Sequence, residues 1–289
     1  MATKRIIIII NKTWEASAIL GAFRSPYNGK VSAKPLEWAP GKPYPTLQDH
    51  NSAGSSYHFC LAFGTTLVEL WCLADFADTS DSGVKCGIVP KIISAGSIPD
   101  LIIAAGTAAS QDSKRNGNVV VGGRTFIHDP GFNPVPPAPN WPTETAGLMD
   151  HILESGFEWS RLAAGATKDI VLRFILPQAN AGCPQVIIDK DQVSVGDVNV
   201  TDPSQYPEGD ARALAACRKA DPQVKIGSID TTLALVRALV RNIPFIFVSG
   251  ISNQLGQFAS EVQPFPFSQN CAASQNIGVT LAWLLPLLV

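Results

Sequence analysis

The sequence predicts an α/β fold built around a largely parallel β-sheet. Short apolar runs recur along the chain, and their apolarity is continuous rather than alternating, as in strands that are covered on both faces. Segments with helical character lie between these runs, which is typical of α/β units. The 289 residues are enough for one such domain, 46% of them are hydrophobic, and no repeat or linker divides them.

The predicted strands are residues 5–11, 68–76, 99–107, 117–127, 185–189 and 243–250. The first of them, RIIIIIN, follows a basic start and superficially resembles a secretion signal. Its apolar run is shorter than a signal core, however, and no small-residue cleavage site follows it. We therefore interpret it as a buried parallel strand.

The predicted helices are residues 13–23, 143–164, 209–220, 230–242 and 272–288. Asp230 is a suitable N-cap for the fourth of them. The last contains LAWLLPLLV, which is far shorter than the roughly 20 apolar residues that span a bilayer. We expect it to be a core helix that stops near Pro286, with no part in membrane binding.

Two long proline-rich segments, residues 24–58 and 129–142, interrupt the pattern. Their prolines exclude regular helix and central strand. Long loops in compact domains are usually functional or disordered. We expect both to be loops of a single domain that covers residues 1–289.

Composition and motifs exclude several classes of function. A net charge of −2 and a pI of about 6.1 give no general attraction to nucleic acid or to anionic membranes. Six cysteines without a CxxC pair predict buried thiols in a reducing compartment, the cytoplasm. The four histidines lack metal-binding spacing, and no phosphate-binding glycine motif occurs, so no metal or cofactor is expected.

Three blocks of sequence carry a resemblance to a known family. They are PDLIIAAGTAASQDSKRNGNVVVGGRTFIHD (99–129), VGDVNVT (195–201) and SIDTTLALVRALVRNIPFIFVSGISN (228–253), and TWEASAIL (13–20) fits the start of the same pattern. In this order they resemble the nucleoside phosphorylase/nucleosidase superfamily, above all its methylthioadenosine/S-adenosylhomocysteine nucleosidases. The resemblance implies a mixed central sheet flanked by helices, a homo-oligomer, and a small-molecule nucleoside as the ligand.

The resemblance also assigns roles near the start of the site. Glu15 would be the carboxylate that orients and deprotonates the attacking water, although an exposed Glu in a first helical turn is the plain alternative. Gly106 would let the backbone turn sharply after the strand. Thr107 would then present its hydroxyl and N–H at the strand's carboxyl end, where α/β sheets bind ligands. Without the resemblance, an ordinary strand-to-loop turn explains both residues equally well.

The later blocks supply the expected contacts to sugar and base. Asp230 falls where the family has a Glu that accepts both ribose hydroxyls, and a carboxylate can chelate a cis-diol. Ile229 takes the place of a Met that packs under the sugar. Asn199 and Val200 match the base-stacking strand, where an aromatic residue is common.

Asn253 raises the main chemical question, because Ser252-Asn253 stands where the family ends this strand with Ser-Asp. An acid there would protonate the departing purine, whereas Asn can only donate a hydrogen bond. The amide is compatible with a 6-oxopurine nucleoside, with weak or absent catalysis, or with a plain polar cap on a strand end.

Three functions therefore remain open. Phosphorolytic relatives often carry an Arg two residues before the glycine of the strand-end turn, where this chain has Ala104, so a nucleosidase that uses water is favoured. The alternatives are a phosphorylase, with inorganic phosphate as co-substrate, and a non-catalytic nucleoside-binding protein.

Overall fold

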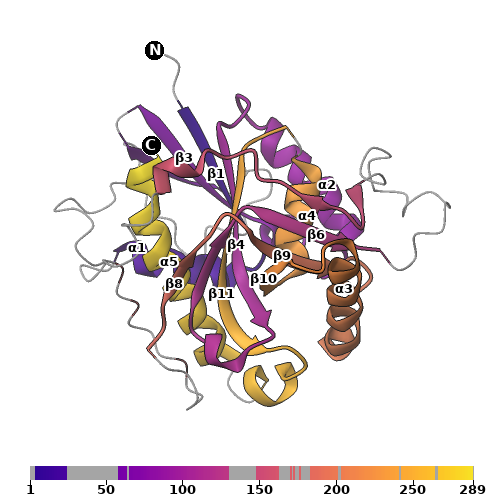
Figure 1. The fold of residues 1–289 in the computed structure, drawn as a ribbon. Helices are drawn as coiled ribbons and strands as arrows, with labels where there is room; N and C mark the ends of the chain where they lie inside the picture. The colour runs from indigo at the N-terminus through magenta and orange to yellow at the C-terminus, as the bar shows by residue number, and fades with distance from the viewer. Residues whose placement is uncertain are drawn as a thin grey trace.

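A mixed β-sheet forms the centre of the computed structural model (Figure 1). The structure describes residues 4–24, 58–63, 65–129, 148–162, 183–200, 203–240, 242–263 and 266–288, together with positions 170, 172 and 176. Within them the strands are β1 (Lys4–Ile10), β2 (His58–Phe63), β3 (Thr66–Cys72), β4 (Leu101–Ser110), β5 (Val119–Gly122), β6 (Arg124–His128), β7 (Ile152–Leu153), β8 (Val186–Ile188), β9 (Gln192–Asp197), β10 (Lys225–Ile229) and β11 (Phe245–Gln254).

The strand order places β4 at the branch point of the sheet. One path runs β2-β3-β1-β4-β10-β9-β6-β7, and β11 pairs with β4 and leads to β5 and β8. β4 is parallel to β1 and β11 but antiparallel to β10. The expected mixed central sheet is therefore confirmed, and the carboxyl ends of β1 and β11 meet beside the second half of β4.

Helices cover both faces of this sheet. They are α1 (Thr13–Arg24), α2 (Ser82–Ser94), α3 (Tyr206–Ala220), α4 (Thr231–Leu239) and α5 (Pro266–Leu288). Figure 1 shows α1 and α5 on one side of the central strands and α2 and α4 on the other, with α3 beyond β9.

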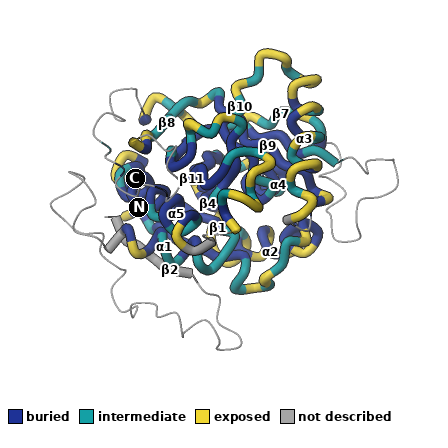
Figure 2. Tube along the Cα trace, turned by 90° about the horizontal axis from the view of Figure 1, so that it is seen from below, coloured by how far each residue is buried: buried dark blue, intermediate teal, exposed yellow. Residues whose placement is uncertain are grey.

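The isoleucine run of β1 fills the core on both faces of the sheet. Ile6, Ile8 and Ile10 pack with residues of α1 and α5, while Ile7 and Ile9 pack with residues of α2 and α4. All five are at most 2% exposed, and Figure 2 shows the central strands as buried. Side chains alternate along a strand, so an unbroken apolar run is what a strand between two helical layers requires.

Helix α5 is the one described helix that is long and apolar enough to cross a membrane by length and composition. However, 72% of the apolar stretch of this helix is buried inside the protein. It packs against α1 and β11, and Asn276 donates a hydrogen bond to the carbonyl of Gly117 at 3.0 Å. The expected role as a core helix is confirmed, although the helix continues through Pro286 to Leu288.

The predicted helix over residues 143–164 is wrong in its described part. Residues 148–162 contain β7 and a short 3₁₀ turn, Trp159–Leu162. Asp150 and Gly156 have φ angles of 60° and 63°, which a helix cannot accommodate. Pairing of β7 with β6 draws this part of the segment into the sheet instead.

The predicted strand over 117–127 is two strands, β5 and β6, which meet at a glycine pair. A Cβ on Gly122 would lie 2.4 Å from Phe247, and one on Gly123 would lie 2.6 Å from Trp159. Glycine therefore permits close packing where the chain passes from one neighbour strand to another. The proline-rich loops 24–58 and 129–142 lie almost wholly outside the described residues.

We expect the substitution Glu69→Ala to lower the free energy of unfolding by about 3–5 kcal/mol, because it leaves a buried charge unpaired. Arg5 and Glu69 form a two-pronged ion pair at 3.0 and 2.8 Å, and both side chains are less than 9% exposed. Glu154→Ala is the matched control, because Glu154 pairs with Arg124 at the surface and its side chain is 71% exposed. Chemical denaturation should show less than about 1 kcal/mol for the control. Equal losses of unfolding free energy in the two variants would show that the buried Arg5–Glu69 pair matters no more than an exposed one.

Candidate active site

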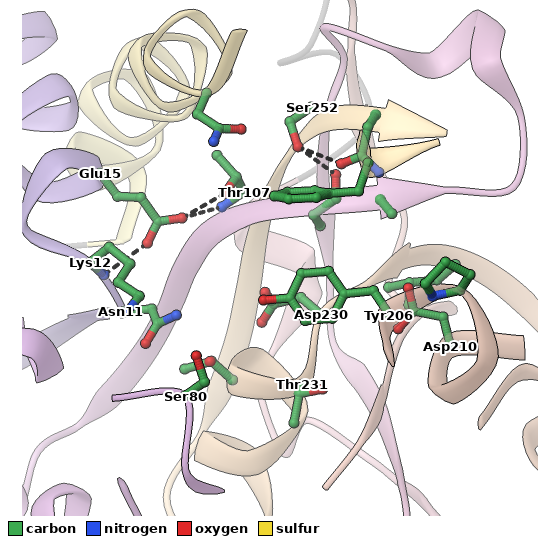
Figure 3. Close-up of a pocket in the computed structure, with 18 of the residues that line it drawn as sticks. Asn11, Lys12, Glu15, Ser80, Thr107, Tyr206, Asp210, Asp230, Thr231 and Ser252 are labelled. Atoms are coloured by element: carbon green, nitrogen blue, oxygen red, sulfur yellow. Dashed lines mark hydrogen bonds between the residues drawn. The ribbon is translucent and has the colours of Figure 1, made fainter. Parts of the chain in front are cut away.

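A cavity of about 310 Å³ opens at the carboxyl ends of β1, β10 and β11 (Figure 3). Ligand sites of α/β sheets lie at this edge, and the volume falls in the usual range for small-molecule pockets. Its described lining combines three carboxylates, two lysines and several aromatic and amide side chains. The lining includes Lys12, Glu15, Lys85, Thr107, Tyr206, Asp210, Ile229, Asp230, Ser252, Asn253 and Phe258.

Glu15 is held in the cavity by a set of hydrogen bonds. Its Oε1 accepts from the backbone N–H of Thr107 at 2.7 Å and from the Thr107 hydroxyl at 2.8 Å. Its Oε2 accepts from the backbone N–H of Lys12 at 3.0 Å. The side chain, although it lies in the first turn of α1, is only 2% exposed. It is therefore a fixed carboxylate in the cavity wall rather than a solvated helix-end charge.

Burial first, and also the nearby Asp230 carboxylate, raise the pKa of Glu15, which lies at about 7 instead of 4.5. The hydrogen bonds from Thr107 and Lys12 oppose this shift because they favour the charged form. A carboxylate with a pKa near neutrality can accept a proton from water and release it again at physiological pH. The site is therefore suited to general-base chemistry.

Gly106 and Thr107 lie within a strand, so the expected sharp turn is wrong. β4 continues to Ser110, and β11 pairs alongside it over this stretch. Gly106 lies beside the carboxylate that Thr107 binds, since a Cβ built on it would be 3.4 Å from Oε1 of Glu15, an ordinary contact distance.

Asp230 occupies the turn between β10 and α4 and caps the helix as expected. Its Oδ1 accepts from the backbone N–H of Leu233 at 2.8 Å. Burial raises its pKa, whereas the helix N–H groups and the charge of Lys85 lower it. Lys85 is 5% exposed, and its Nζ donates to the Thr232 hydroxyl at 3.1 Å. One carboxylate oxygen caps the helix, and the Asp230 side chain also faces the cavity (Figure 3).

Asn253 reaches the cavity through an irregularity in β11. The strand predicted to end at residue 250 runs on to Gln254. The pairing register with β4 shifts between Ile251 and Asn253, and such bulges re-aim side chains. The Asn253 Oδ1 accepts from the Ser252 hydroxyl at 2.8 Å, and its Nδ2 donates to the carbonyl of Gln254 at 3.0 Å. One amide N–H is left for a ligand.

The remaining predicted site residues divide into two groups. Ile229 is buried at the end of β10 and lines the cavity. Asn199 and Val200 are not among the described residues that line it. Asn199 is exposed and donates to Asp129 at 3.0 Å, while Val200 is buried against Gly209 of α3. Asn199 and Val200 therefore do not form the cavity wall, and Val200 packs against α3 instead.

No family model matches the chain, and no curated protein matches it. Solved structures do. A futalosine hydrolase of Helicobacter pylori strain 26695 is 12% identical with a TM-score of 0.53, and the match covers 98% of each chain. An S-adenosylhomocysteine nucleosidase of Streptococcus pyogenes in complex with 5-methylthiotubericidin is 17% identical with a TM-score of 0.53, covering 98% of this chain and 97% of that one.

A 5′-methylthioadenosine/S-adenosylhomocysteine nucleosidase of Neisseria meningitidis in complex with methylthio-immucillin-A gives a similar result, at 16% identity, a TM-score of 0.53 and 98% coverage of each chain. The chain has the nucleoside phosphorylase/nucleosidase fold. The resemblance drawn from the sequence is confirmed at this level.

Tyr206, Asp210 and Phe258 are among the cavity residues that were not predicted from the sequence. Tyr206 and Asp210 lie one turn apart on α3, and Phe258 lies on the short π-helix after β11. The rings of Tyr206 and Phe258 meet edge to face with centroids 5.3 Å apart. The i, i+4 spacing of Tyr206 and Asp210 is the one available signal, but the predicted helix began at residue 209 and so excluded Tyr206.

Proposed function

We propose that this protein cleaves the N-glycosidic bond of a purine-type nucleoside, with water as the nucleophile. The observation that carries the proposal is the presence of Glu15 and Asp230 in one cavity of a nucleosidase fold. Glu15 is the base for water, and Asp230 is the acceptor for the sugar hydroxyls. The structural neighbours named above are nucleosidases or hydrolases by their descriptions, which supports hydrolysis for a chain of this fold.

The chemistry follows from the two carboxylates. The C1′–N bond breaks, its electron pair moves to the base, and the sugar gains positive character. The oxygen of a water molecule then bonds to C1′, and Glu15 takes up the proton that this water releases. Asp230 binds the sugar diol by charge-assisted hydrogen bonds, which fix C1′ relative to the water.

The base has three proposed partners on the other side of the cavity. The free N–H of Asn253 can donate to a ring nitrogen or to an exocyclic oxygen. Ser252 holds that amide through its hydroxyl, at 2.8 Å. The Tyr206–Phe258 pair supplies the aromatic surface that Asn199 and Val200 do not.

Phosphorolysis is the second candidate, and the charges near Glu15 argue against it. Ala104, where phosphorolytic relatives often carry Arg, is buried in β4. Of the lysines in the described lining, Lys12 is paired with Asp78 at 2.6 Å and Lys85 donates to Thr232. A buried carboxylate at the position of the nucleophile also repels a phosphate dianion, whereas it assists a neutral water.

The experiment is product analysis with inosine, adenosine and 5′-methylthioadenosine, with and without phosphate. We expect free base and free sugar in equal amounts and at the same rate in both buffers. Ribose 1-phosphate among the products would establish the phosphorylase instead. Binding of these nucleosides in a thermal-shift assay without any product would establish the non-catalytic alternative.

We further propose a cytoplasmic homo-oligomer. Among the described residues Cys183 is exposed and Cys271 is half-buried, whereas Cys72, Cys86 and Cys217 are buried free thiols, and burial raises the pKa of each of these three to about 12. Such thiols are inert and fit a reducing compartment. Light scattering of the purified chain tests the oligomeric state.

A further inference from the structure

We propose that Asp210 donates the proton to the departing base, an assignment that rests on the proposed function. The need for a donor follows from the chemistry at residue 253. The leaving base gathers negative charge as the glycosidic bond breaks, and an amide cannot give up a proton. Asn253 is also committed to Ser252 and Gln254 through two of its hydrogen bonds.

The position of Asp210 suits this role. It lies on α3 one turn after Tyr206, and both side chains line the cavity. Figure 3 shows Tyr206 and Asp210 side by side, across the cavity from Glu15. Asp230 lies between Glu15 and this pair. A nucleoside whose sugar lies on Asp230 therefore places its C1′ toward Glu15 and its base toward α3.

The carboxyl of Asp210 has the freedom that a proton donor needs. No hydrogen bond or ion pair among the described residues uses it, in contrast to Asp197, which accepts from Arg212 at 3.3 Å and from the Asn199 N–H at 2.8 Å. Arg212 is shared between Asp197 and Glu208. The cation nearest in sequence is therefore already paired, and Asp210 is left facing the cavity.

The charges that face Asp210 favour its protonated form. Asp230 lies at the start of α4 and Asp197 at the end of β9, and both are acidic; Glu208 and Arg212 on α3 pair with each other. Burial first, and then Asp230 and Asp197, raise the pKa of Asp210 from 3.8 to about 7. The acid is therefore partly protonated at neutral pH, as a general acid requires.

Asp210 and Glu15 together account for every proton in the reaction. Asp210 transfers its carboxyl proton to a ring nitrogen of the base as the C1′–N electron pair arrives there. Glu15 gains one proton from the attacking water. Each turnover therefore leaves Asp210 ionised and Glu15 neutral, and exchange with solvent restores both. The net reaction is nucleoside plus water to sugar plus neutral base.

The test is the substitution Asp210→Asn, assayed for hydrolysis as a function of pH. We expect kcat to fall by about 10²–10⁴-fold with little change in KM, because proton transfer typically contributes that factor. We also expect the loss of activity above pH 7 to disappear from the pH profile. Glu208→Gln on the same helix, 82% exposed, should leave kcat and the profile unchanged. Asn253→Ala should cost only about 2–10-fold, the share of one neutral hydrogen bond.

A binding measurement separates this inference from the proposed function. Calorimetry with free adenine between pH 5.5 and 8.5 needs no turnover. In the unsubstituted protein the affinity for adenine should fall as pH rises through about 7, because ionised Asp210 can no longer donate a hydrogen bond to the base. Asp210→Asn should remove that dependence. A protein that cleaves nucleosides while Asp210→Asn keeps full kcat and the same pH profiles overturns the inference alone. If the protein cleaves no nucleoside but its affinity for adenine still depends on pH through Asp210, only the proposed function is overturned.

Discussion

The substitution Glu15→Gln should lower kcat for nucleoside hydrolysis by about 10²–10⁴-fold, the usual contribution of a positioned general base. Glutamine retains the oxygen that accepts from Thr107 but cannot take up a proton from water. Its NH₂ group also replaces the oxygen that accepts from the Lys12 N–H at 3.0 Å. Steady-state assay with the best nucleoside of the panel, together with a melting curve to show that the variant is folded, measures the effect.

The pH profile supplies an independent check on Glu15. The base must be ionised, and burial raises its pKa to about 7, so activity should decline as pH falls below that value. This acidic limb should be missing from any residual activity of Glu15→Gln. A folded variant that keeps more than a tenth of the kcat, with the acidic limb intact, would exclude Glu15 as the base.

The second large effect is expected at Asp230, where the side chain serves both the helix and the ligand. Asp230→Ser keeps a good N-cap for the Leu233 N–H but is too short and uncharged to hold the sugar diol. We expect kcat/KM to fall by about 10–150-fold, because a hydrogen bond to a charged group contributes about 1.5–3 kcal/mol. The free energy of unfolding should change little, since the cap is retained.

A substrate pair controls the Asp230 prediction. The 2′-deoxynucleoside lacks one of the hydroxyls that Asp230 is proposed to accept, so the unsubstituted enzyme should discriminate against it. The Ser variant should treat the two substrates almost alike, because the acceptor is gone. Unchanged discrimination would show that Asp230 is only a helix cap.

The sequence predicted the layered α/β architecture because its strongest signals were local. Five consecutive isoleucines are typical of a strand with helices on both faces, and Asp230 before an apolar helical pattern is a direct capping signal. Glu15, Thr107, Asp230 and Asn253 were also named from the sequence, and the structure brings all four to one cavity. The order of the family-like blocks carried that information.

The errors arose where long-range contacts decide the conformation. Gly106 was taken for a turn residue, yet β4 continues through it to Ser110 because β11 pairs alongside. The segment 143–164 has helical spacing, yet pairing with β6 draws part of it into the sheet. The i, i+4 spacing of Tyr206 and Asp210 does not by itself indicate a site, because the packing of α3 against β9 is what places them at the cavity.

A crystal structure of Glu15→Gln soaked with intact nucleoside is the decisive test of a shared sugar and base site in this cavity. We expect an uncleaved nucleoside in the cavity, with its sugar hydroxyls on Asp230, its base toward Asp210 and Asn253, and a water beside residue 15. A nucleoside bound elsewhere, or with its sugar out of reach of Asp230, would contradict it.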